Sequence, residues 1–495
     1  MSTTLRPATV ARTLGDLADM CGLAVRAQDR DLAVTGVTLD SRDVRAGDLF
    51  AALPGAHAHG ASYADEARAR GAVAMLTDVD HADGIEGMPA VVAADPRSVL
   101  GEVAAEIYGR PGERLLLVGV TGTNGKTTTA YLLEAGLRAA GYATGVIGTT
   151  GIRLGDQVIP SARTTPEAPE LHALLGTMVE RGIDAVAMEV SSHALALGRV
   201  DGLRFDAAVF TNLTQDHLDF HGTMENYFEA KASLFTPARA GRAIVGIDDE
   251  WGRRLAERQA IPTTTFSLDG EADVACLGIE DDLGEQRLVV GCDGQRHDVV
   301  VGLPGRFNAA NGLAAWTTLH LLGIPDAVLS TAMRDVRVPG RMELVDEGQD
   351  FVAVVDYAHS PDSVERVISS VEPAPGGRRI VVLGCGGDRD RDKRAVMGRL
   401  GASMADVFIV TDDNPRSEDP ASIRAAMLAG IARPRAEVRE IPDRREAIRS
   451  AVAEARPGDV LLLLGKGHEP GQEIAGVTYP FSDREELAVS LREAT

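Results

Sequence analysis

The stretch at residues 118–129, VGVTGTNGKTTT, most constrains what this chain can fold into. An apolar run over residues 115–120 precedes it and predicts a short buried strand. The residues from 128 to 140 predict a helix. Glycines between a strand and a helix let backbone N–H groups turn toward a ligand, and the helix N-terminus adds positive potential. This order predicts a phosphate-binding loop in an α/β fold.

The side chains of the loop suit nucleotide phosphates. Lys126 can reach the terminal phosphates, and the Thr127 hydroxyl is suited to Mg²⁺. Val120 stands where the usual pattern has its first glycine, so the loop is a shorter variant with Gly122 inside it. A Gly/Thr-rich turn without a ligand is the alternative. The expected phosphate contacts are Gly122, Thr123, Asn124, Gly125, Lys126, Thr127 and Thr128.

Length, composition and charge limit the possible classes of protein. The 495 residues suffice for about three domains of ~150 residues each. No apolar run approaches the ~20 residues of a membrane span, and residues 1–13 lack the apolar core of a secretory signal. The four cysteines form no C-x-x-C pair, as is typical of reduced cytoplasmic proteins. The net charge of −23 disfavours general binding to nucleic acid or anionic membranes.

Strand and helix patterns alternate in three parts of the chain. In residues 1–110 we expect a helix over 13–25 and a strand over 34–39, after which the LDSR motif either holds a ligand or forms a plain turn. A Gly- and Pro-containing stretch at 109–112 marks a boundary. Most predicted strands of the chain end in polar loops, which favours parallel, doubly wound α/β sheets. Residues 274–302 differ and predict three antiparallel strands.

Two side chains after predicted strands are candidate metal ligands. Glu189 ends one strand, and His217 lies in the loop after the next strand. A carboxylate is a normal ligand of Mg²⁺, whereas histidine is less usual. A purely structural role for each residue remains the alternative.

Lys231 is predicted to lie on the apolar face of a helix. Tyr227, Lys231, Leu234 and Phe235 are spaced i, i+4, i+7 and i+8. Burial disfavours the ammonium form and lowers the pKa of a lysine. A neutral amine can react with CO₂ to give a carbamate, an anion suited to Mg²⁺. The alternative is a lysine whose stem is buried and whose ammonium reaches water.

Eight motifs, in this order, resemble those of the Mur ligases, and within that family the type that adds meso-diaminopimelate. The resemblance covers essentially the whole chain. The motifs are TGTNGKTT at 121–128, MEVSSHAL at 188–195, NLTQDHLDFHGTMENYFEAK at 212–231, GRFNAAN at 305–311, PGRME at 339–343, DYAHSPDS at 356–363, DDNPR at 412–416 and GKGHE at 465–469.

The resemblance implies an α/β protein with three domains. These are a UDP-binding domain over residues 1–110, a P-loop ATPase domain over 111–340, and a Rossmann-like amino-acid-binding domain over 341–495. The implied activity is ATP-dependent ligation of meso-diaminopimelate to UDP-N-acetylmuramoyl-L-alanyl-D-glutamate through an acyl phosphate. It belongs to cytoplasmic peptidoglycan precursor synthesis, and we expect a monomer with no nucleic-acid or membrane partner.

The resemblance also implies roles for single residues. Lys126, Lys231 and His217 are catalytic, and Lys231 carries the carbamate. Thr127, Glu189, His217 and Lys231 line the Mg²⁺ sites. Asn308, Arg341 and Asp356 contact the nucleotide. The remaining contacts are Leu39 and Ser41 to uridine, Thr164, Thr165, Ser191 and Arg199 to the muramoyl-dipeptide, and Arg389, Asp413, Asn414, Pro415, Arg416, Gly465 and Glu469 to the amino acid.

The chain departs from the family pattern at two positions. Arg163 stands where relatives often have Asn, and Leu197 stands where some have Gln. Both departures concern the dipeptide contacts.

Two rival functions share the phosphate loop. A folylpolyglutamate synthase has the same ATPase module, but DNPR and the match to the uridine site argue against it. A P-loop switch protein would hydrolyse nucleotide without an acceptor and would have no use for DNPR or GKGHE.

Overall fold

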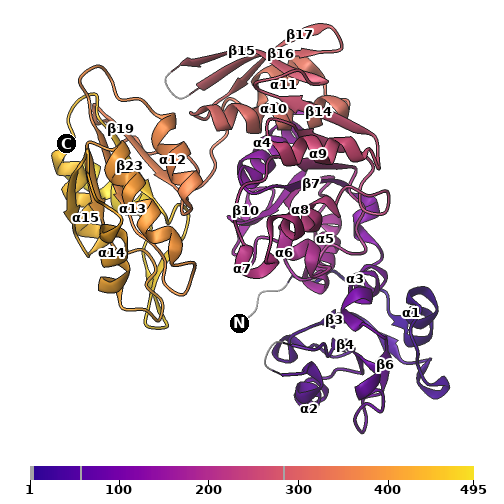
Figure 1. The fold of residues 1–495 in the computed structure, drawn as a ribbon. Coiled ribbons are helices and arrows are strands. Elements are labelled where there is room, and N and C mark those ends of the chain that lie inside the picture. Colours follow the sequence, from indigo (N-terminus) through magenta and orange to yellow (C-terminus); the bar gives the residue numbers. More distant parts are fainter. Residues whose placement is uncertain (1–4, 56–57, 283–284, 495) are drawn as a thin grey trace.

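The computed structural model describes residues 5–55, 58–282 and 285–494, and its sheets lie in three successive parts of the chain (Figure 1). The N-terminal part is built on a parallel sheet in the order β3-β4-β5-β6. The strands of this part are β1 (Arg12–Thr13), β2 (Ala33–Val34), β3 (Gly36–Thr38), β4 (Asp48–Ala51), β5 (Ala74–Thr77) and β6 (Ala90–Val92), and its helices are α1 (Leu14–Cys21), α2 (Ala64–Ala69) and α3 (Pro96–Ile107).

Two expected elements of this part are shorter than predicted. The strand expected over 34–39 is interrupted at Thr35, whose N–H donates to the Gly47 carbonyl oxygen. As a result β2 pairs with β1, whereas β3 pairs with β4. The helix expected over 13–25 ends at Cys21 because Gly22 adopts a left-handed conformation with φ 67°.

The middle part contains an eleven-stranded sheet in the order β10-β9-β8-β11-β7-β12-β13-β14-β15-β16-β17. Its strands are β7 (Leu116–Thr121), β8 (Thr144–Gly148), β9 (Gly151–Leu154), β10 (Gln157–Ile159), β11 (Ala185–Glu189), β12 (Ala207–Phe210), β13 (Ala243–Gly246), β14 (Thr263–Ser267), β15 (Val274–Asp282), β16 (Glu285–Cys292) and β17 (Gln295–Val301). Its helices are α4 (Lys126–Ala139), α5 (Ala168–Glu180), α6 (Ser192–Ala196), α7 (Leu218–His221), α8 (Met224–Ala232), α9 (Glu250–Arg258), α10 (Arg306–Leu321) and α11 (Asp326–Ala332).

The central strands of this sheet are parallel and buried on both faces. Val118 and Val120 of β7 pack into one hydrophobic cluster with α4 and α10, whereas Leu117 packs into a second cluster with α5 and α8. Strands covered on both sides are apolar throughout, which explains the run that made β7 recognisable. The three strands expected over 274–302 are β15, β16 and β17, and their antiparallel pairing is confirmed.

The C-terminal part has a six-stranded sheet in the order β18-β19-β23-β20-β21-β22, in which only β18 is antiparallel to its neighbour. Its strands are β18 (Glu343–Leu344), β19 (Val352–Asp356), β20 (Arg379–Leu383), β21 (Val407–Val410), β22 (Glu437–Glu440) and β23 (Val460–Leu464), followed by the hairpin β24 (Gly471–Ile474) and β25 (Val477–Pro480). Its helices are α12 (Pro361–Ser370), α13 (Asp392–Met404), α14 (Pro420–Ala429), α15 (Arg444–Glu454) and α16 (Asp483–Ala494).

The middle and C-terminal parts contact each other through α12 and through the loop after β23. The Asn124 side-chain amide donates to Asp362 at 2.9 Å, and His468 Nε2 lies 3.0 Å from the Thr149 carbonyl oxygen. The limits expected near residues 110 and 340 fall between the three sheets, and we propose them as the domain boundaries. Within the described residues, no helix has both the length and the apolar character that crossing a membrane requires.

Candidate functional site

The phosphate loop joins β7 to α4 and depends on two glycines with positive φ. Gly122 has φ 147° and Gly125 has φ 87°. A Cβ atom at Gly122 would overlap the Thr211 hydroxyl, and one at Gly125 would overlap the Asn311 side chain. The helix begins at Lys126, two residues earlier than expected. Lys126 and Thr127 therefore lie in its first turn.

Two lysines converge on one carbonyl oxygen of this loop. Lys126 Nζ donates to the carbonyl oxygens of Gly122 at 2.9 Å and Thr123 at 2.8 Å, and Lys231 Nζ donates to Gly122 at 2.7 Å. Burial lowers the pKa of both amines, that of Lys231 well below its usual range, and Lys126 lowers it further. Among the described residues, neither lysine forms a salt bridge. The loop thus holds two amines that no carboxylate pairs with, and burial disfavours the charged form of each.

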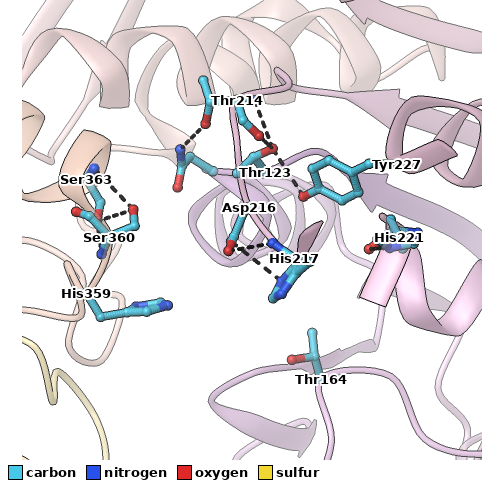
Figure 2. Close-up of polar contacts among 12 residues, drawn as sticks. Thr123, Thr164, Thr214, Asp216, His217, His221, Tyr227, His359, Ser360 and Ser363 are labelled. Carbon is cyan, nitrogen blue, oxygen red and sulfur yellow. Dashed lines mark hydrogen bonds and ion pairs between the residues drawn. The ribbon is translucent and has the colours of Figure 1, made fainter. Parts of the chain in front are cut away.

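These residues line a cavity of about 290 Å³ between the middle and C-terminal parts. The cavity brings together most of the expected nucleotide and metal residues. The expected nucleotide and metal residues that line it are Thr123, Asn124, Gly125, Lys126, Thr127, Thr128, Glu189, His217, Lys231, Asn308, Arg341 and Asp356, and the expected dipeptide residues Thr164 and Ser191 line it as well. Figure 2 shows His359, Ser360 and Ser363 facing Asp216 and His217 across this space.

The C-terminal wall of the cavity holds a cation and an acid in fixed positions. The Arg341 guanidinium lies over the Tyr357 ring, 4.6 Å from its centre. Asp356 accepts the N–H groups of Met342 at 2.7 Å and Ala358 at 2.8 Å. Burial raises the pKa of Asp356, and the nearby Arg341 opposes that shift. These contacts fix the orientation of both side chains in the absence of a ligand.

The candidate Mg²⁺ ligands follow three adjacent strands of the sheet. Glu189 ends β11, Thr127 follows the loop after β7, and His217 lies beyond β12 with φ 53°. Burial lowers the pKa of His217 to about 4, so its ring is neutral at pH 7. A carboxylate and a hydroxyl oxygen suit a hard cation, and a carbamate would add another oxygen. The residues present therefore fit a magnesium site.

From the sequence, no role in the site was predicted for Thr149, Thr214 or Tyr227, which help to organise it. Thr149 donates its N–H and its hydroxyl to the Glu189 carboxylate, at 2.7 and 3.1 Å. The Thr123 hydroxyl lies 3.2 Å from the Tyr227 hydroxyl and bonds both backbone groups of Thr214 (Figure 2). Tyr227 belongs to one of the motifs that carried the resemblance, so its position there was the available signal.

The expected dipeptide residues lie beside Glu189. Thr164 and Ser191 line the cavity, and the Thr165 hydroxyl donates to the Glu189 carbonyl oxygen at 2.9 Å. Arg199 forms a salt bridge with Glu167 at 2.9 Å and donates to the Thr165 carbonyl oxygen at 3.3 Å. Thr165 and Arg199 therefore bond to other protein groups and are not part of the cavity lining.

The two positions that depart from the family pattern lie close to these residues. Arg163 is exposed, with its Nε 3.7 Å from Glu167. The Leu197 carbonyl oxygen accepts from Arg97.

The expected uridine residues lie away from the cavity. Leu39 and Ser41 follow β3, at the carboxyl edge of the N-terminal sheet. The Ser41 side chain is buried and donates to Glu66 at 2.7 Å. The LDSR motif therefore lies at the end of a parallel strand, as expected, in the place where α/β sheets hold ligands.

The expected amino-acid residues gather in the C-terminal part. Asn414 donates to Glu469 at 2.6 Å, and the fully buried Lys466 donates to Asn414 at 3.2 Å and lies 3.3 Å from Glu469. Gly465 packs against Asp413, and Pro415 against the GGDRD loop, where Arg389 is exposed. The strands that precede these loops, β20, β21 and β23, are adjacent and parallel, so the loops share one sheet edge as expected.

Arg416 adopts a left-handed backbone conformation with φ 53°. It donates to the Gly387 carbonyl oxygen at 2.7 Å, and its Nε lies 3.5 Å from Glu473. A pairing with Asp412 or Asp413 was the alternative to a substrate role. Among the described residues neither pairing occurs, since Asp412 instead contacts Arg424.

Two other groups in the described residues have the spacing of metal ligands. In the first, His59 accepts the Ala61 N–H at Nδ1, so its Nε2 carries the proton that Asp78 accepts at 2.9 Å. In the second, the group Cys292, Asp293 and His320 combines a core cysteine, an exposed turn residue and a histidine paired with Asp326. Protein contacts account for both groups.

Three family models match the chain. These are "Mur ligase family, catalytic domain" at residues 33–108, "Mur ligase middle domain" at 120–319 and "Mur ligase, glutamate ligase domain" at 340–467. The chain belongs to the Mur ligase family and has its α/β architecture.

Curated relatives extend over the whole chain. One is the UDP-N-acetylmuramoyl-L-alanyl-D-glutamate–2,6-diaminopimelate ligase of Streptomyces avermitilis, 52% identical over 99% of this chain and 97% of the relative. Another is the UDP-N-acetylmuramyl-tripeptide synthetase of Leifsonia xyli, 44% identical over 99% and 98%.

Solved structures agree with these relatives. A UDP-N-acetylmuramoyl-L-alanyl-D-glutamate–2,6-diaminopimelate ligase superposes with a TM-score of 0.72 at 32% identity, covering 98% of this chain and 99% of that one. The MurF ligase of Thermotoga maritima in complex with ADP, at 19% identity and a TM-score of 0.65, covers 93% of this chain and 98% of that one, and shares the fold.

Proposed function

We propose that this protein is an ATP-dependent ligase that joins meso-diaminopimelate to UDP-N-acetylmuramoyl-L-alanyl-D-glutamate. The observation that carries the proposal is the cavity itself. The phosphate loop, the acidic Glu189 and the C-terminal residues Arg341 and Asp356 meet there, with the amino-acid loops on an adjoining sheet edge. The names of full-length relatives supply the substrates.

The first step joins two anions, so it needs local positive charge. The terminal carboxylate of D-glutamate attacks the γ-phosphate of ATP, ADP leaves, and an acyl phosphate forms. Lys126, which donates to loop carbonyl oxygens in this structure, would turn toward the phosphates, and the N-terminus of α4, which begins at Lys126, adds positive potential there. Positioning and electrostatic stabilisation account for this kind of phosphoryl transfer.

The second step forms the amide bond. The neutral amine of the amino acid attacks the acyl carbon, phosphate leaves, and the amine loses a proton. Water would hydrolyse the acyl phosphate, so the site must exclude it. The contacts Asn124–Asp362 and Thr149–His468 bring the C-terminal part over the cavity, which supports such exclusion.

Mg²⁺ would be held by Thr127, Glu189 and His217, and when bound it would neutralise charge on the transferring phosphoryl group. We propose that Lys231 carries a carbamate next to it. The support is local: Lys231 is buried, its pKa is lowered, and it shares the Gly122 carbonyl oxygen with a second lysine. Carbamylation would replace the repulsion between two amines with attraction.

The roles of the remaining site residues follow from the resemblance to the Mur ligases. We propose that Leu39 and Ser41 contact uridine and that Thr164, Thr165, Ser191 and Arg199 contact the dipeptide. The protein would act as a monomer in the cytoplasm, where UDP-linked precursors and ATP are present.

The decisive experiment measures phosphate release with ATP alone, with UDP-muramoyl-dipeptide added, and with meso-diaminopimelate added as well. We expect sustained release only in the complete mixture, together with UDP-muramoyl-tripeptide. Equal release from ATP alone would instead support the switch-protein alternative. The carbamate is tested separately by ¹³C NMR with ¹³CO₂, in which Lys231→Ala should lose the carbamate signal and nearly all activity.

A further inference from the structure

Thr149 connects three parts of the proposed site. It follows β8, and its N–H and hydroxyl hold the two oxygens of Glu189. Its hydroxyl lies 3.1 Å from that of Thr164, and its carbonyl oxygen lies 3.0 Å from His468 Nε2. A single residue thus contacts a metal ligand, a dipeptide residue and the amino-acid domain.

The direction of these hydrogen bonds is determined by their acceptors. A carboxylate only accepts, so the Thr149 hydroxyl donates to Glu189 and accepts from Thr164. A carbonyl also only accepts, so His468 Nε2 carries a proton and donates it to Thr149. The Thr164–Thr149–Glu189 bonds are in series and polarise one another, whereas the His468 bond acts by fixing the position of the Thr149 backbone.

His468 is held in place from the C-terminal side. Its ring packs 5.3 Å from that of Tyr357, and its backbone N–H lies so close to Gly340 that a Cβ atom there would overlap it. The next residue is Glu469, a proposed amino-acid contact. Movement of the GKGHE loop on amino-acid binding would therefore be transmitted to His468.

We propose that His468 is a positioning residue that couples occupancy of the amino-acid site to the orientation of the Glu189 carboxylate. The proposal rests on the proposed function. The His468 ring N–H holds the Thr149 carbonyl oxygen, and the N–H and hydroxyl of the same residue hold the Glu189 carboxylate, which is a proposed Mg²⁺ ligand. Because coupling between two binding sites is reciprocal, amino acid should tighten metal binding and metal should tighten amino-acid binding by one common factor.

The test is a Mn²⁺ titration followed by electron paramagnetic resonance, with a non-hydrolysable ATP analogue present, with and without meso-diaminopimelate. In the wild type, we expect the amino acid to lower the Mn²⁺ dissociation constant about 3- to 10-fold, the worth of one hydrogen bond. His468→Ala should bind Mn²⁺ equally with and without amino acid. His468→Gln, whose amide can donate, should restore part of the factor.

The matched control is His320→Gln, at a partly buried histidine of α10 outside the cavity. In this variant the amino acid should lower the Mn²⁺ dissociation constant as much as in the wild type. The result would show that the effect of His468→Ala does not come from a general loss of stability. The coupling would be overturned if meso-diaminopimelate left the Mn²⁺ dissociation constant of the wild type unchanged. It would also be overturned if the amino acid lowered that constant as much in His468→Ala as in the wild type. Failure of the wild type to make tripeptide would instead overturn the proposed function.

Discussion

The phosphate loop and the amino-acid loops differ in whether their basic side chains are paired with carboxylates. Lys126 and Lys231 donate only to backbone carbonyl oxygens in the hydrogen bonds of the described structure. In the C-terminal part, by contrast, Lys466 lies against Glu469 and Arg416 against Glu473. In the first site no carboxylate is paired with either lysine among the described residues, so Lys126 remains available to an anion, whereas the second site already pairs its charges. An amino acid carries both an ammonium and a carboxylate, so each of its charges can replace one partner of such an ion pair. A polyphosphate carries only negative charge and cannot do so.

The largest expected effect tests the charge pairing of the second site. L-Lysine differs from meso-diaminopimelate by lacking the distal carboxylate, which Arg416 would grip with two parallel bonds. Since a site built around a polar group rejects the analogue without it, kcat/KM for lysine should be lower by about 10⁴. The rates are measured at saturating ATP and UDP-muramoyl-dipeptide. Similar values for both amino acids would refute this role of Arg416.

The role of Lys126 in the phosphate loop is tested by Lys126→Ala. The change removes a cation aimed at the transferring phosphoryl group, so kcat for ligation should fall by about 10² to 10³. Arg138→Ala, at an exposed cation in the last turn of the same helix, should behave as wild type. Near-normal turnover of Lys126→Ala would mean that the loop does not bind the reacting phosphates.

Arg416→Ala separates the two sites within one variant. We expect the KM for meso-diaminopimelate to rise about 10- to 100-fold, as for the loss of charged hydrogen bonds, while the Kd of ATP stays unchanged. Arg435→Ala, an exposed arginine of the same domain, is the control. Calorimetric titration with ATP and steady-state kinetics with the amino acid give the two readouts, and an equal loss in both would contradict independent sites.

The smallest effect concerns the contact between the phosphate loop and α12 of the C-terminal part. Asp362→Ala removes the acceptor of the Asn124 amide, one hydrogen bond of about 0.5–1.5 kcal/mol. The KM for ATP should therefore rise only a few-fold. Glu365→Ala, at an exposed position of the same helix, should leave it unchanged. A rise of 100-fold would show that Asp362 contacts the nucleotide directly.

Much of the fold could be predicted because its signals are local. The strands at residues 379–383 and 460–464 have the predicted bounds, since each is a short buried run next to turn residues. Burial of Lys231 followed from the i, i+4 spacing of its helix. Element ends were less predictable, as α4 shows by starting at Lys126, where the left-handed Gly125 allows the chain to turn into the helix.

The sequence by itself determined the residue types of each loop and the order of the strands that carry them. Only the tertiary structure decided that Asn311 packs against Gly125, that two lysines share the Gly122 oxygen, and that His468 contacts Thr149. The reason is physical. Local patterns record which face of an element is apolar, whereas contacts between distant loops depend on how whole sheets and domains pack, and no short stretch of sequence encodes that packing.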